Sequence, residues 1–370
     1  MNELRNRFFR RNIFLLLLPA LFFLVQCKEP ASLSALIISD GGSEVNDGLK
    51  TILENSGLFD ADIAKNNAAN YSSYDVVVLN LSNAEWDEET SKKFADYVSA
   101  GGGVVALANS AYAFRENGEL SKLFGLSDRT MADKSAEPYS FKLVNTKEEN
   151  PVTNGLNESW MHADDYLFFG TETLTGETEV LATAWADTLQ GGNGAHLPVL
   201  YTTTSGDGKV FISTLGMSAG NDDLTSIQCV GFISTFQRGA EWAATGIVSQ
   251  DVSVDFPNSV SVHSWEDYRP LDIDELFNRS MNYEVGKSKK YLNDISMRIR
   301  NSDGKAQTYA AFEEQILDYL SSDASVDSKR YFCRELSWIG SEKSVAVLEK
   351  LVNDKDLSES ASYALQRLRM

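Results

Sequence analysis

Apolar and polar stretches alternate regularly along the first third of the chain. The runs LSALIIS (residues 33–39), YDVVVLN (74–80) and AGGGVVALANS (100–110) are continuously apolar in their centres, which is typical of strands buried on both faces of a sheet. Between them, residues 46–58 and 87–98 have helical spacing of their apolar positions. This order of strand, helix, strand, helix, strand predicts right-handed crossovers and an open parallel sheet with helices on both faces.

The pattern continues for about half of the remaining chain and then changes. We expect strands at residues 179–183, 198–203 and 209–214 and a last helix over 226–244. Polar alternation and two prolines indicate a linker after that helix. We therefore place an α/β domain at 34–250 and a linker at 251–271.

Only helical patterns follow from Asp272 to the end of the chain. Four separate faces carry apolar residues at helical spacing, for example Phe312, Ile316 and Leu320 on the first of them. Residues 327–368 resemble a HEAT-type unit, in which short polar turns join pairs of helices. Because only about two such units fit, we expect residues 272–370 to form a packed cap or docking surface rather than a long superhelix.

The first 26 residues have the features of a secretion signal. Arginines at positions 5, 7, 10 and 11 precede an apolar run of 13 residues from Ile13 to Val25, which is too short to cross a bilayer as a helix. The sequence LVQC ending at Cys27 resembles a bacterial lipobox, although Gln26 is unusual there. We expect lipidation of Cys27, a tether over residues 27–33, and a location in the cell envelope. Lys28 favours the outer membrane, by analogy with sorting rules in other bacteria.

The charge of the chain excludes some partners. The formal net charge is −20, and loss of the signal would make it −23, because four arginines and one glutamate leave with it. Such a surface repels phosphate backbones and anionic lipid, so nucleic acid is not an expected partner, and contact with the membrane is expected only through the lipid. Cys229 and Cys333 are expected to be small buried residues rather than a disulfide.

Motifs between residues 150 and 248 resemble one family. NPVTNGL, VLATAW, GDGKVFISTLG and QCVGFISTFQRGAEWAATG are similar, in this order and spacing, to the trehalose-utilisation ThuA-like family. The resemblance covers about residues 34–250. It implies the flavodoxin-like fold of class I glutamine amidotransferases, and it implies an association with disaccharides or keto-sugars.

Ligands of an open parallel sheet bind beyond the carboxyl ends of its strands. Polar residues are expected there after the first strand, after the VVALA run and after the last strand. Others lie in the segment just before Leu167 and in the GNGAHLP turn. They are Asp40, Gly41, Gly42, Asn109, Ser110, His162, Asp164, Asp165, His196, Asn221 and Asp222, with Met217 beside them. The two glycines would let backbone N–H groups approach a ligand, although they also suit a tight turn.

Four positions in this predicted crevice depart from the chemistry that the resemblance implies. A glutamine amidotransferase needs a nucleophilic Cys after the central strand, where this chain has Ala108, so that activity is not expected. Tyr166 stands for a Glu, Leu197 for a Glu and Met217 for a His of the family pattern. A thioether neither transfers protons nor binds hard cations. We infer that the family's chemistry is altered or lost here.

Three functions are compatible with these observations. The first is binding of a sugar or sugar-derived ligand with little or no catalysis, for which aromatic residues are available at Tyr112, Trp160, Tyr166 and Trp185. The second is an enzyme acting on a trehalose-like or keto-glycoside substrate, with His162 as acid and base and Asp165 orienting it or sharing a divalent metal. The third is a scaffold that docks an envelope protein through residues 272–370. The sequence requires no cofactor, and a structural, hydrogen-bonded His162 is an equal alternative to a catalytic one.

Overall fold

The computed structural model describes residues 32–40, 42–64, 70–84, 86–126, 133–171, 174–217, 223–253, 255–302 and 306–369. The signal segment, the first five residues of the tether with Cys27, and the candidates Gly41, Asn221 and Asp222 lie outside these residues.

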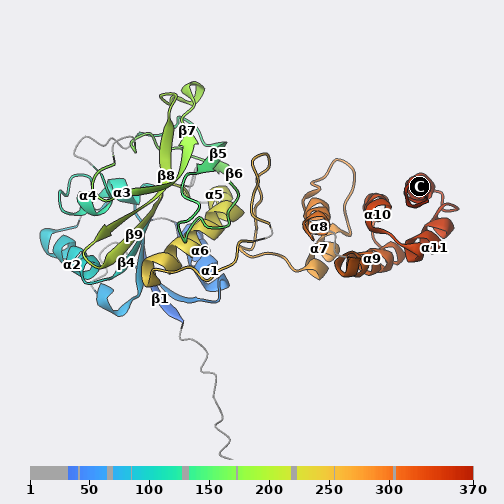
Figure 1. Cartoon of the computed structure of the whole chain (residues 1–370), viewed down its shortest axis with the longest axis horizontal. Helices are drawn as coiled ribbons and strands as arrows, with labels where there is room; N and C mark the ends of the chain where they lie inside the picture. The colour runs from blue at the N-terminus through green and yellow to red at the C-terminus, as the bar shows by residue number, and fades with distance from the viewer. Residues whose placement is uncertain are drawn as a thin grey trace, which may run out of the picture. The chain divides into compact units, whose positions relative to one another are not determined.

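One sheet of nine strands forms the centre of the first domain (Figure 1). Its order is β2-β1-β3-β4-β9-β8-β7-β5-β6. The strands are β1 (Leu33–Ser39), β2 (Phe59–Ala64), β3 (Val76–Asn80), β4 (Gly103–Leu107), β5 (Tyr139–Asn145), β6 (Ser159–Asp165), β7 (Glu179–Trp185), β8 (His196–Ser205) and β9 (Gly208–Ser213).

The α/β fold is confirmed, but parallel pairing is limited to part of the sheet. Strands β2, β1, β3, β4 and β9 run parallel, whereas β8, β7, β5 and β6 continue the sheet with antiparallel pairing. Only residues 206 and 207 separate β8 from β9, and a two-residue turn can join only antiparallel neighbours. The prediction of a parallel sheet is therefore corrected to a mixed sheet.

Helices cover both faces of the sheet, as expected. The helices α1 (Ser43–Asn55), α5 (Thr225–Gln228) and α6 (Val230–Thr245) contribute to one apolar core, and α2 (Glu88–Ser99), α3 (Ser110–Ala113) and α4 (Leu120–Leu123) to a second. Short 3-10 turns lie at η1 (Tyr71–Ser73) and η2 (Thr188–Gln190). The helix expected at 226–244 is interrupted at Cys229, whose backbone is extended.

The predicted linker makes backbone contacts with the start of α6. Val230 N–H donates to the carbonyl of His263 at 2.9 Å, and Trp265 N–H donates to the carbonyl of Gln228 at 2.8 Å. These two bonds satisfy backbone groups on both sides of the break between α5 and α6, which explains why the helix does not run straight through Cys229.

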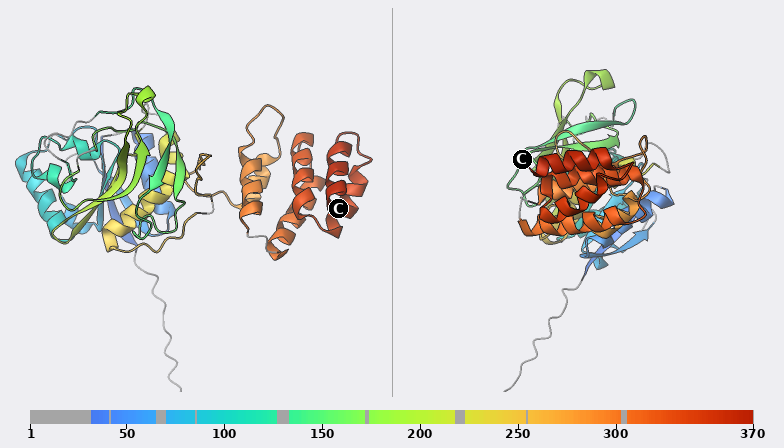
Figure 2. Two further views of the ribbon diagram at one scale, coloured as in Figure 1. Left: turned by 45° about the horizontal axis from the view of Figure 1, so that its top comes forward. Right: turned by 90° about the vertical axis from the view of Figure 1, so that its right-hand side faces the viewer.

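The C-terminal part of the chain is entirely helical in its described residues. It contains α7 (Ile273–Ser280), α8 (Lys290–Asn301), α9 (Ala306–Ser321), α10 (Val326–Ile339), α11 (Glu342–Leu351) and α12 (Ser358–Leu368), packed around one core (Figure 2). Asp272 and Glu275 form a capping box at the start of α7. The HEAT-type organisation stays a prediction. No helix among the described residues combines the length and apolar character needed to span a bilayer.

Candidate functional site

The carboxyl ends of β1, β3, β4 and β9 meet at one edge of the sheet, because these strands are parallel neighbours. This edge is where the fold places its ligands. The side chains of Ser39 and Asn80 are joined across it by a hydrogen bond of 3.2 Å, with the Asn80 amide donating.

Ala108 occupies a strained turn between β4 and α3. It follows β4 directly and has a φ of +48°, which side chains other than glycine rarely adopt. Its N–H donates to the carbonyl of Leu215 at 3.1 Å, and α3 begins two residues later. A strained turn between strand and helix is the geometry that presents a catalytic side chain. Here the geometry is present and the side chain is a methyl group.

Three of the predicted ligand residues hold the loop after β3 in place. The Asp40 carboxylate accepts hydrogen bonds from the N–H groups of Ser82 and Asn83, at 2.9–3.2 Å. The Asn109 amide donates to the carbonyl of Ser82 at 3.2 Å. The hydroxyl of Ser110, which is fully buried, accepts from Leu81 N–H and donates to the Leu79 carbonyl, both at 2.8 Å. These side chains therefore support the rim of the crevice rather than open into it.

His162 and Asp165 form a completely buried pair at the end of β6. Nε2 of His162 lies 2.9 Å from Oδ2 of Asp165, and both side chains are 0% exposed. The same Oδ2 accepts from Gly216 N–H at 2.8 Å, and Oδ1 accepts from Tyr166 N–H at 2.7 Å. The pair thus fixes the backbone that follows β9. The carboxylate contacts the imidazole, and neither group reaches solvent.

The thiol of Cys229 completes this buried network. Burial alone lowers the pKa of His162, but the neighbouring Cys229 and Asp165 raise it to about 9. Burial raises the pKa of the Asp165 carboxyl, and the favourable contact with His162 opposes that rise. Cys229 and Cys333 are both buried and free, as predicted. Sequence reasoning missed the neighbourhood of Cys229 and His162, because 66 positions separate them and neither belongs to a spaced motif.

The remaining candidates lie apart from this pair. Asp164 is exposed and accepts from the hydroxyl of Ser140 at 2.5 Å. His196 is exposed at the start of β8, where its ring contacts that of Trp185 at 5.4 Å. Met217 packs, partly buried, against the second core, and Gly42 precedes α1. His196 is thus not brought to His162 and Asp165 by any contact of the described residues.

The four aromatic residues offered for sugar binding have different environments. Tyr112 and Trp160 are buried, and Tyr112 stacks on Phe168 with ring centroids 5.4 Å apart. Trp185 is 49% exposed. Tyr166 is half-buried under Lys134, whose ammonium lies 2.9 Å from the ring centroid. Core packing therefore accounts for Tyr112 and Trp160.

Sequence reasoning also missed Lys134. Burial lowers the pKa of this lysine, although Asp165 and Glu137 oppose the shift. Its backbone pairs with Phe168 in an isolated bridge, which brings it beside Tyr166 and Asp165 from a distant part of the chain. No motif marks it in the sequence. Within the described ranges, no group of three or more His, Cys, Asp and Glu side chains is arranged to hold a metal ion.

Comparison with known proteins shows which solved structures and which family the chain is similar to. A solved ThuA-like protein from Parabacteroides merdae is 29% identical, covers 65% of this chain and 100% of its own, and superposes with a TM-score of 0.59. A second ThuA-like protein, from Bacteroides uniformis, is 17% identical over 59% of this chain and 93% of its own, with a TM-score of 0.44. A cytoplasmic protein from Salmonella typhimurium is 18% identical over 57% of this chain and 99% of its own, with a TM-score of 0.42. No curated protein matches the chain. The ThuA family, described as "Trehalose utilisation", matches residues 36–243, more than half of the sequence, and the chain belongs to this family.

Proposed function

We propose that this protein binds a sugar or sugar-derived ligand at the carboxyl edge of its sheet and does not turn it over by nucleophilic chemistry. The observation that carries the proposal is Ala108, a methyl group at a φ of +48° in the turn where the fold positions a nucleophile. The family description, trehalose utilisation, supplies the ligand class. Glutaminase activity is not expected from a chain with this turn.

Titration calorimetry of the purified protein tests the proposal. We expect heats of binding with at least one of trehalose, sucrose, maltose and a keto-disaccharide, with dissociation constants in about the micromolar to millimolar range. The same sugars should be recovered unchanged after prolonged incubation. If none of these sugars bound, the proposal would be wrong.

The alternative of an active enzyme depends on His162 and Asp165. Both side chains are 0% exposed, so a substrate could reach them only after the residues packed around them had moved. Turnover of any sugar in the panel that His162→Ala abolished, while His196→Ala left it unchanged, would favour the enzyme.

We also propose a lipid anchor at Cys27, with the mature protein held in the cell envelope, in the outer membrane. The lipobox-like LVQC sequence and the apolar run before it support this proposal. Metabolic labelling with a radioactive fatty acid should mark the wild-type chain and leave the Cys27→Ala variant unlabelled. A labelled variant, or an unlabelled wild type in a host with lipoprotein processing, would contradict the anchor.

A further inference from the structure

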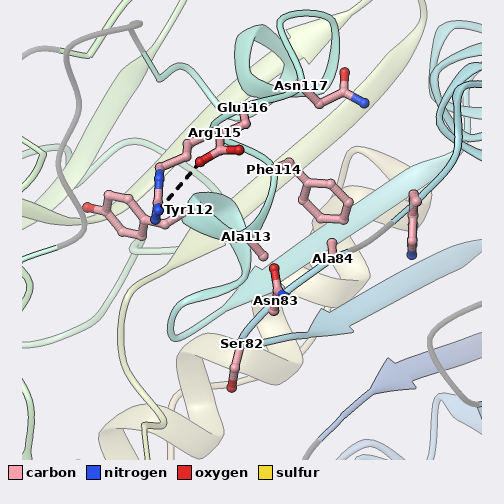
Figure 3. Close-up of a pocket in the computed structure, with 10 residues that line it drawn as sticks. Ser82, Asn83, Ala84, Tyr112, Ala113, Phe114, Arg115, Glu116 and Asn117 are labelled. Carbon is pink, nitrogen blue, oxygen red and sulfur yellow. Dashed lines mark ion pairs between the residues drawn. The ribbon is translucent and has the colours of Figure 1, made fainter.

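A cavity of about 510 Å³ opens between the loop after β3 and the segment after β4 (Figure 3). Its volume lies within the about 300–1,000 Å³ typical of small-molecule sites. Ser82, Asn83 and Ala84 form one side and residues 112–117 the other, so the cavity lies at the carboxyl ends of two adjacent parallel strands. We infer that this cavity is the site for a neutral, polyhydroxylated ligand of mono- or disaccharide size, an inference that rests on the proposed function.

The loop on one side of the cavity is held rigidly by its own supports. Its backbone groups at Leu81, Ser82 and Asn83 are bonded to the side chains of Ser110, Asn109 and Asp40. Side chains that fix a loop reduce the entropy lost when a ligand binds. Three of the residues that the sequence predicted as ligand contacts, Asp40, Asn109 and Ser110, therefore act as the frame of this cavity.

The walls combine aromatic and polar groups. Trp86 is the partly exposed aromatic residue of the lining. It meets the buried ring of Phe114 edge to face, with ring centroids 4.8 Å apart, and contacts Phe94 at 5.2 Å. The polar groups are those of Ser82, Asn83, Arg115, Glu116 and Asn117. Small-molecule sites characteristically join aromatic surface to a few placed polar groups, and a sugar offers both apolar C–H faces and hydroxyl groups to such walls.

The charges of the lining favour a neutral ligand. The guanidinium of Arg115 and the carboxylate of Glu116 lie 3.8 Å apart, one charge of each sign (Figure 3). An anionic ligand would meet the Glu116 carboxylate and the field of a chain with net charge −20, and a cationic ligand would meet Arg115. Hydroxyl groups can accept from the guanidinium and donate to the carboxylate without adding charge.

Titration calorimetry with trehalose and the rest of the sugar panel tests the inference on cavity variants of the full chain. Ser82→Trp fills the mouth of the cavity from an exposed loop position, and the double variant Arg115→Ala, Glu116→Ala removes two exposed polar groups. We expect each to weaken binding by at least about tenfold. Arg369→Ala, which removes an exposed, ion-paired arginine outside the cavity, should bind as the wild type does.

The outcomes separate this inference from the proposed function. If the wild type binds a sugar and both cavity variants bind it within about twofold of the wild type, the sugar binds elsewhere and only the inference is wrong. If the wild type binds no sugar, both are wrong. Affinity for these neutral sugars should also be unchanged between low and high salt, and a steep salt dependence would overturn the inference. Unchanged circular dichroism and melting temperature of Ser82→Trp show that a loss of binding is local.

Discussion

Ala108 keeps a backbone conformation that its side chain does not favour. An L-residue in the left-handed region is strained by roughly 1–2 kcal/mol, whereas glycine adopts it freely. Ala108→Gly relieves this strain but gives the unfolded chain extra conformational entropy. The net effect should be a rise of about 1 kcal/mol in the free energy of unfolding. A rise of about 2–4 °C in melting temperature, measured by calorimetry, would follow for a domain of this size.

The matched control lies two residues earlier, inside β4. Ala106 is also buried but is not among the residues with positive φ. Ala106→Gly should destabilise by about 1 kcal/mol, since glycine weakens a strand interior. Destabilisation of similar size in both variants would mean that the turn at Ala108 stores no strain.

The buried pair of His162 and Asp165 predicts a dependence of stability on pH. The pKa of His162 is raised to about 9 in the folded protein, from an unperturbed value of 6.5. At His162 itself the folded state thus binds more protons than the unfolded state between these values, whereas Cys229, whose pKa the neighbouring His162 lowers, binds fewer. The stability from this group is fully present below about pH 6.5 and is lost as pH rises through about 9, with a slope of at most about 1.4 kcal/mol per pH unit.

His162→Gln should remove this part of the pH dependence. We expect the variant to be less stable by about 3 kcal/mol or more at pH 6, because Asp165 then stays buried without a cationic partner. Its unfolding midpoint in urea should vary less than that of the wild type between pH 6.5 and 9. The exposed His196 provides the control, and His196→Gln should follow the wild-type profile. A wild-type pH profile equal to that of His162→Gln would contradict a protonated His162.

The sequence located several site residues without giving their roles. Asp40, Asn109 and Ser110 were expected at the carboxyl edge because they follow apolar strands, and they lie there. That their side chains hold residues 81–83 depends on hydrogen bonds between neighbouring strands, which a linear pattern does not encode. The cavity itself was not predicted. Trp86, Arg115 and Glu116 belong to no motif, and only folding brings Trp86 to the same cavity as the other two.

Arg238 on helix α6 bonds the helix to two other segments of the chain. It is 5% exposed, and its guanidinium donates to the carbonyls of Pro151, Val152, Asn154 and Gln250 at 2.5–2.8 Å. This contact joins the segments NPVTNGL and QRGAEW, which are far apart in the sequence. Lysine cannot reproduce a planar fork with five donors.

Arg238→Lys should lower the free energy of unfolding by about 3 kcal/mol, because several buried carbonyls lose a charged donor together. Urea denaturation followed by circular dichroism measures this change. Arg369→Lys, at an exposed position after α12, should shift it by no more than about 0.5 kcal/mol. Equal effects of the two substitutions would show that the carbonyls find other donors.

Strands were predictable where both of their faces are buried. The run at β1 is continuously apolar, and its predicted bounds are those observed. By contrast, β2 lies at one edge of the sheet with the polar sequence FDADIA, and β6 at the other edge carries His162 and Asp165. Edge strands have fewer apolar positions, so their periodicity is weak. Among the antiparallel pairs, only β8 and β9 are joined by a two-residue turn that requires this direction, and the pairs β5–β6, β5–β7 and β7–β8 have no such signal, which is why a parallel sheet was expected.

The whole chain carries a large excess of negative charge, and this predicts how salt affects it. Exposed ion pairs such as Lys92–Asp96 and Lys93–Glu89 are each worth only about 0–1 kcal/mol, and salt weakens them. Repulsion among the unpaired carboxylates of a chain with net charge −20 acts over the entire surface in the opposite sense. Because the Debye length falls from about 10 Å at 0.1 M to about 3 Å at 1 M salt, added sodium chloride screens this long-range repulsion first. The melting temperature at pH 7 should therefore rise with sodium chloride concentration.

The same measurement near the isoelectric point supplies the control. At about pH 4.6 the net charge approaches zero, so screening has little repulsion to remove and the rise should disappear. Addition of sodium sulfate at both pH values separates screening from salting out, since sulfate stabilises by exclusion from the surface whatever the charge. A melting temperature that fell with sodium chloride at pH 7 would mean that local ion pairs outweigh the net charge, and the surface would then be stabilised pair by pair despite its acidity.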